Sequence, residues 1–185
     1  TYFAILYQES MYGDEKRKQE LLLDRGQIID YYKKNPAPIV DLSIRDPLKV
    51  LSTNTYQKGG WVLNMLRHKL GDAVFWKGIR TYYKTYQNSN AMTKDFQTIM
   101  ETAAGQDLES FFQQWIFTEG YPEINWKWKY SNGIVRISID QIQEHHVFTF
   151  PLEIAIKNGK KTRIETLEIT KSSQEFQIPL NLKPE

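Results

Sequence analysis

The residues whose types and spacing could carry chemistry lie in the stretch 54–71, which opens with Asn-Thr-Tyr-Gln-Lys-Gly-Gly. Tyr56 is the candidate within this stretch. A phenol, with a pKa of about 10, keeps its proton at neutral pH and can donate a hydrogen bond to an oxyanion without becoming charged. The alternative is a helix-initial aromatic ring that only packs on its neighbours, and the residue types alone favour that alternative.

Few other residues have side chains that could take part in catalysis. The three histidines are His68, His145 and His146, and none belongs to an HExxH pair. We expect His68 to lie on a helix surface, and the side chains of His145 and His146 to diverge in a loop rather than share a metal. The chain has no cysteine, which excludes disulfides, thiolate zinc sites and a cysteine nucleophile. Residue types alone therefore predict no complete catalytic constellation and no metal site, and they leave substrate-binding residues unassigned.

The stretch that contains Tyr56 is expected to form one helix. Thr53, Asn54 or Thr55 supplies a capping oxygen at its start, and Gly71 ends it. Adjacent glycines in a helix lower its stability by about 1 kcal/mol each relative to alanine, so we expect another backbone or a substrate to approach closely there. One face carries apolar residues at helical spacing: Gly59, Val62, Leu63, Leu66 and Leu70.

The elements around this helix follow from the same periodicity. Apolar spacing and breaker residues predict further helices of about a dozen residues joined by short polar loops, which is typical of an antiparallel helical bundle. Asn35-Pro36-Ala37-Pro38 ends the second helix and leads into an ordered loop over residues 39–51. The expected helices other than 54–71 are 1–12, 15–34, 72–86, 93–104 and 107–120.

At Tyr121-Pro122 the apolar period changes from 3.6 to 2. Asn132-Gly133 and Asn158-Gly159 are tight-hairpin signals between alternating segments. We therefore expect two domains, a helical one over 1–121 and a small antiparallel β-sandwich over 122–185. The expected strands are 124–130, 134–141, 147–156, 162–169 and 175–180.

Composition narrows the choice of partners. The chain has 185 residues with 24 Lys and Arg against 22 Asp and Glu, a net charge of +2. No basic face is implied, which argues against nucleic acid as a partner. No apolar run reaches membrane-spanning length, so we expect no membrane span. The sequence assigns no cellular compartment.

The run Tyr56-Gln57-Lys58-Gly59-Gly60 resembles the aminopeptidase N family of zinc metallopeptidases, which includes leukotriene hydrolase. Five residues alone would be unspecific, but an ordered series of matches that covers nearly the whole chain is specific. Thr1-Tyr2 is similar to the residues that follow the family's Asn-Glu-Gly-Phe-Ala segment. The later matches include Gly78-Ile79-Arg80, Asn90-Ala91, Asp95-Phe96, Phe111-Phe112, Gln114-Trp115 and Gly120-Tyr121-Pro122.

The resemblance implies a fold and an activity. It implies the C-terminal half of a thermolysin-like catalytic domain followed by an immunoglobulin-like β-sandwich. In the family an HExxH helix and the Glu of Asn-Glu-Gly hold zinc, and zinc activates the water that attacks the peptide carbonyl. Tyr56 occupies the place of the family's tyrosine that donates a hydrogen bond to the resulting oxyanion. Peptides are the implied substrates.

The chain contains neither zinc-binding motif. We therefore expect a fragment cut at both ends, whose parent is a zinc aminopeptidase and whose own 185 residues bind no zinc and hydrolyse nothing. The missing N-terminal half is then a partner, and we expect an exposed apolar patch where it would pack, around Tyr2, Phe3, Ile5 and Leu6, with self-association through it. The alternative is a non-catalytic helical and sandwich module that binds a protein, in which Tyr56 only packs.

Overall fold

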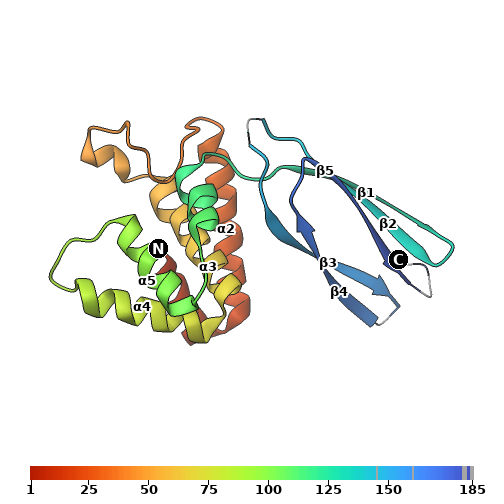
Figure 1. Ribbon diagram of the computed structural model, residues 1–185, viewed down its shortest axis with the longest axis horizontal. Coiled ribbons are helices and arrows are strands. Elements are labelled where there is room, and N and C mark those ends of the chain that lie inside the picture. Colours follow the sequence, from red (N-terminus) through yellow and green to blue (C-terminus); the bar gives the residue numbers. More distant parts are fainter. Residues whose placement is uncertain (145, 160, 181–182, 184–185) are drawn as a thin grey trace. The chain divides into compact units, whose positions relative to one another are not determined.

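The computed structural model describes residues 1–144, 146–159, 161–180 and 183. The chain divides into two compact units, Thr1–Gly120 and Tyr121–Glu185. Figure 1 shows that the first unit is built of helices and the second of strands. The predicted fold class, a helical part followed by an antiparallel β-sandwich, is confirmed. Within the described ranges, no helix has both the length and the apolar character needed to cross a membrane.

The helices of the first unit begin and end close to the positions that the sequence predicts. Gly71 and Gly105 end two of them with φ of 75° and 65°, positive values that favour glycine. The helical elements in chain order are α1 (Tyr2–Tyr12), α2 (Asp14–Tyr32), the 3₁₀ turn η1 (Pro47–Val50), the π-turn η2 (Asn54–Lys58), α3 (Gly59–Leu70), α4 (Asp72–Tyr86), α5 (Thr93–Ala104), α6 (Glu109–Phe112) and the π-turn η3 (Gln113–Phe117).

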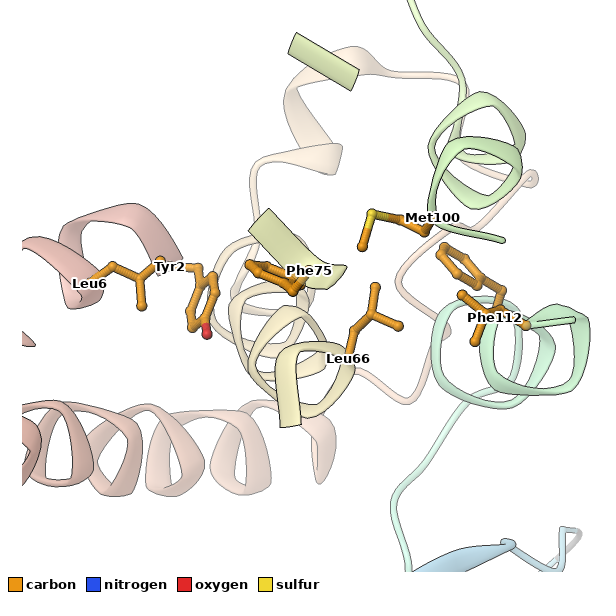
Figure 2. Packing of buried hydrophobic residues seen from close by; sticks show 7 residues of the cluster. Tyr2, Leu6, Leu66, Phe75, Met100 and Phe112 are labelled. Carbon is orange, nitrogen blue, oxygen red and sulfur yellow. The ribbon is translucent and has the colours of Figure 1, made fainter. Parts of the chain in front are cut away.

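One continuous apolar core joins α1, α3, α4, α5 and α6. Phe75 of α4 is fully buried and meets Tyr2 of α1 edge-on, with their ring centroids 6.3 Å apart. Figure 2 shows Phe75 between Tyr2 on one side and Leu66 and Met100 on the other, and α3 and α5 contribute these last two to the same cluster. The core therefore joins residues from opposite ends of the helical sequence.

A close helix crossing lies at the edge of this core. A side-chain Cβ at Gly78 of α4 would overlap the Sδ atom of Met100 and lie 2.9 Å from its Cε atom. Because Met100 is itself fully buried, it has little room to withdraw. Gly78 thus allows α4 and α5 to approach each other.

The predicted apolar patch on α1 is wrong for three of its four residues. Tyr2, Ile5 and Leu6 are buried and only Phe3 is exposed. The reason is that α1 packs against both α2 and α3, which cover one side of the helix. The large apolar side chains that α1 does expose, here called the outer face of α1, are Phe3, Tyr7, Met11 and Tyr12.

The helix expected over 54–71 runs without a break to Leu70, but its first turn is wider than an α-helical turn. Residues 54–58 form the wider turn η2, and the regular helix α3 begins only at Gly59. The predicted loop over 39–51 contains η1, whose first turn is capped by the Asp46 side chain accepting from the Leu48 N–H at 3.0 Å.

The second unit consists of two antiparallel sheets. β1 (Ile124–Ser131), β2 (Ile134–Gln141) and β5 (Ser173–Pro179) form one sheet in the order β1-β2-β5, and β3 (Phe150–Asn158) pairs with β4 (Lys161–Ile169) in the other. Both sheets contribute to one apolar core. Asn132 and Gly133, with φ of 51° and 74°, form the predicted tight turn between β1 and β2. The inward-facing core residues are Val135, Ile137, Ile139, Ile156, Leu167, Ile169 and Ile178.

The edge strand β1 departs from this pattern. Trp126 and Trp128 pair across the ladder with Ile139 and Ile137, so all four side chains lie on the same face of the sheet. The two isoleucines are buried, yet Trp126 and Trp128 are 60% and 38% exposed. The core face of the sheet therefore continues into an uncovered aromatic surface on β1.

Candidate functional site

Tyr56 lies in the middle of the π-turn η2 and its side chain is 46% exposed. Its backbone N–H donates to the Ser52 carbonyl oxygen at 3.0 Å. The neighbouring Thr55 hydroxyl donates to the Val50 carbonyl oxygen, which ties the turn to the end of η1. The backbone at Tyr56 is thus held by hydrogen bonds while the ring remains accessible to solvent.

The opposite side of the same turn is buried and polar. Asn54 and Lys58, four residues apart, are each only 5% exposed. The Asn54 side-chain Nδ2 donates to the carbonyl oxygens of Ala37 and Pro38 at 2.8 and 3.4 Å. These bonds fasten η2 to the proline-rich segment after α2.

Lys58 has no comparable bond. Its Nζ atom is buried and has no hydrogen-bond partner among the described residues. Burial disfavours the ammonium and lowers the pKa of Lys58 to about 8, although the negative charge of Glu119 partly opposes this shift. The turn that presents Tyr56 therefore encloses an amine that ionises close to neutral pH.

The two glycines after Lys58 lie next to different neighbours. A Cβ at Gly60 would lie 3.5 Å from the Tyr2 backbone nitrogen, so α1 approaches α3 at this point. That distance is an ordinary contact which an alanine would tolerate. At Gly59 the nearest atom to such a Cβ is the Asn54 carbonyl oxygen of the same turn, at 3.9 Å. The expected approach of another backbone is present at Gly60, but it does not require glycine.

An apolar cavity of about 290 Å³ lies beside α3 within the helical unit. Its walls come from α3, α4, α5, α6, η3 and the segments before η1 and α5. The side chains that line it are almost all aliphatic or aromatic, with polar atoms on Tyr82 and Thr93. It carries no charged group and adds no catalytic function to the Tyr56 turn.

The histidines do not join Tyr56 in a site. His68 is exposed on α3, as the sequence predicts. His146 packs its ring edge-on against Phe148, with ring centroids 4.7 Å apart, while His145 lies outside the described residues. Across the described part of the chain, no three or more His, Asp or Glu side chains come together in a way that could hold a metal.

Sequence reasoning singled out Tyr56 and missed the two polar residues behind it. The available signal was the spacing of Asn54 and Lys58, because residues four apart in a helical turn share one side. The sequence gives no sign that Lys58 is buried, since a lysine in a helix is normally exposed. Its burial depends on the packing of η2 against α2 and α3.

Comparison with known proteins gives consistent results. Residues 1–115 match the family model described as the Peptidase family M1 domain. The chain is 33% identical to aminopeptidase N of Lactococcus lactis over 88 residues, which is 46% of this chain and 10% of that protein. It is 28% identical to the puromycin-sensitive aminopeptidase of Caenorhabditis elegans over 152 residues, which is 80% of this chain and 14% of that protein.

A solved structure shares the fold. The crystal structure of Legionella pneumophila aminopeptidase A in complex with aspartic acid superposes with a TM-score of 0.75 at 16% identity, covering 99% of this chain and 21% of that one. The chain thus spans a small part of the proteins that it matches. Since the family model covers more than half of the 185 residues, this chain belongs to peptidase family M1.

Proposed function

We propose that this chain is part of a zinc-dependent aminopeptidase that removes N-terminal residues from peptides. Membership of peptidase family M1 supports this proposal, as do the aminopeptidase names of the relatives. Peptides are then the substrates of the longer protein. The 185 residues alone are proposed to be inactive, because the resemblance assigns the zinc ligands and the general base to sequence motifs that this chain does not contain.

In this proposal zinc is bound by the longer protein and not by these 185 residues. The described residues do not fit a zinc site, because they offer no group of three or more suitable ligands. No step proposed for this chain therefore runs through a metal that it holds.

We propose that Tyr56 donates a hydrogen bond from its hydroxyl to the oxyanion that forms when the peptide carbonyl is attacked. The observation that carries this role is the geometry of η2, which fixes the backbone at Tyr56 while leaving the ring half exposed. A donor held in place before the reaction stabilises the developing charge without reorganising at that moment. A buried hydroxyl, by contrast, could not reach a substrate.

The test is Tyr56→Phe in the longer protein. We expect kcat to fall by at least about tenfold with zinc content unchanged, since removing one oxyanion donor typically raises the barrier by roughly 3–4 kcal/mol. Tyr83→Phe is the matched control, because Tyr83 is also exposed but lies on α4, and it should leave kcat unchanged. Equal rates for Tyr56→Phe and the unmodified enzyme would remove Tyr56 from the reaction.

That negative result would favour the alternative, a non-catalytic module that binds a protein. The outer face of α1 is the observation in its favour, because clustered exposed apolar side chains are typical of interaction sites. We propose that in the longer protein its remaining part covers this face. When that part is absent, the face is proposed to pair with a second copy of this chain.

A further inference from the structure

Among the described residues, Lys58 is a buried amine whose role the proposed function leaves open. The structure places it on the buried side of η2, two residues after Tyr56, which occupies the exposed side of the same turn. The other buried polar residue of the turn, Asn54, donates from its Nδ2 to two backbone carbonyl oxygens of the segment after α2. Lys58 has no such bond within the described chain.

A lysine in this position is unfavourable as a packing residue. Its aliphatic stem could fill the same space as methionine, which has no charge to bury. A buried ammonium without a partner loses its hydration and receives nothing in exchange. Simple packing therefore does not account for an amine at this position.

We infer that Lys58 is a positioning residue for Tyr56: its buried amine, on the opposite side of the turn, sets how the phenol is presented. This inference rests on the proposed role of Tyr56 at the oxyanion. The uncharged amine fits the enclosed space and keeps the turn closed. The ammonium favours a slightly opened turn in which Nζ gains water or moves towards Glu119, and Tyr56 moves with the backbone.

The groups around Lys58 determine whether its amine carries a charge. Glu119 is the charged group whose field acts on Lys58, and it favours the ammonium. Helices α2 and α3 pack against η2, and no described charge on either of them adds to the balance at Nζ. Burial and Glu119 are therefore the two influences that decide the charge of Lys58 near neutral pH.

The experiment follows Tyr56 in the full 185-residue chain during a pH titration. Carbon-13 at the tyrosine Cζ is observed by NMR, and Tyr56→Phe identifies the Tyr56 signal. We expect that signal to shift with a midpoint at about pH 8, the pKa of Lys58. The shift should vanish in Lys58→Met and in Lys58→Gln, and it should persist in Lys69→Met, which removes an exposed lysine from α3.

The inference is overturned if the Tyr56 signal has no inflection near that pH, or if the inflection survives Lys58→Met. Should Lys58→Met unfold the chain, the polar variant Lys58→Gln and the titration of the unmodified chain still decide the question. A purely structural Lys58 would change stability without coupling its ionisation to the Tyr56 signal. The measurement needs neither zinc nor turnover, so its failure is distinct from a failure of the Tyr56→Phe rate test.

Discussion

The helical unit and the sandwich differ in how they depart from the usual arrangement, in which apolar side chains are buried and polar ones are exposed. Among the described residues, the buried polar side chains of the molecule are Asn54, Lys58 and Gln97, and all three belong to the helical unit. The described buried side chains of the sandwich are apolar. The sandwich shows the opposite exception, because two large aromatic side chains on the core face of β1, Trp126 and Trp128, are exposed.

The exceptions also differ in whether the polar groups involved have hydrogen-bond partners. Gln97 is satisfied, because its Nε2 donates to the carboxylates of Glu101 and Glu109 at 2.7 Å each. Asn54 is satisfied by backbone carbonyls, and exposed tryptophans leave no polar group unpaired. Lys58 alone combines burial with an amine that finds no partner in the described chain. Two half-buried residues, Asp24 and His146, also have a buried polar atom without a partner there. Among the fully buried side chains of the described residues, the uncompensated one lies in the turn that carries Tyr56.

The largest expected loss of stability comes from a substitution in the apolar core of the helical unit. Phe75→Ala should lower the free energy of unfolding by about 3–5 kcal/mol, because it removes a fully buried ring and leaves a cavity between α1, α3 and α4. Urea denaturation followed by circular dichroism measures the change. Tyr83→Ala on the exposed side of α4 is the control and should stay within about 0.5 kcal/mol. A similar loss for both variants would mean that the cluster in Figure 2 is not the core.

A smaller change in stability is expected when Lys58, the buried lysine without a hydrogen-bond partner in the described chain, is replaced. The pKa of Lys58 is about 8 in the folded state against an ordinary 10.5, so the unfolded chain holds this proton over a range where the folded chain has lost it. Stability should therefore rise with pH between about 8 and 10.5, and the full penalty applies below that range. Lys58→Met should raise the free energy of unfolding by about 2–3 kcal/mol at neutral pH.

Denaturation curves at neutral and alkaline pH check this prediction. The gain from Lys58→Met should shrink as the pH rises, because the unmodified chain then buries an uncharged amine. Lys69→Met should give no such pH-dependent gain, since Lys69 is exposed. A loss of stability at neutral pH in Lys58→Met would show that the amine has a favourable partner, and the contrast with Gln97 would disappear.

The smallest effect belongs to the sandwich. Trp126→Thr should change the free energy of unfolding by no more than about 0.5 kcal/mol, because the side chain is largely exposed and threonine suits a strand. Its cross-strand neighbour Ile139 is buried, so Ile139→Thr should lower stability by roughly 2–4 kcal/mol in the same denaturation assay. Equal losses at the two positions would mean that the aromatic surface of β1 is covered.

Several elements could be predicted from local sequence alone. Gly71 and Gly105 end their helices with the positive φ that glycine favours, and Gly105 does so in the left-handed αL conformation. Asn132-Gly133 forms the expected turn, and the alternation on either side of it sets the register from Ile124 opposite Gln141 to Ser131 opposite Ile134. These features depend on residues that are neighbours in the chain, and so a single sequence contains the information.

Burial could not be predicted in the same way. The apolar side chains of α1 gave no means of separating Tyr2, which is buried, from Phe3, which is exposed, because that choice depends on where α2 and α3 lie. The wide turn η2 was also missed, since its residues fit a regular α-helix equally well.

The sequence by itself determined the helices, the strands, their turns and the family, because periodicity, breaker residues and ordered matches are properties of the chain alone. It also singled out Tyr56. Only the tertiary structure decided that Tyr56 is half exposed while Lys58, two residues away, is enclosed. The physical reason is that desolvation of an amine is set by the segments packed around it, and these come from distant parts of the sequence.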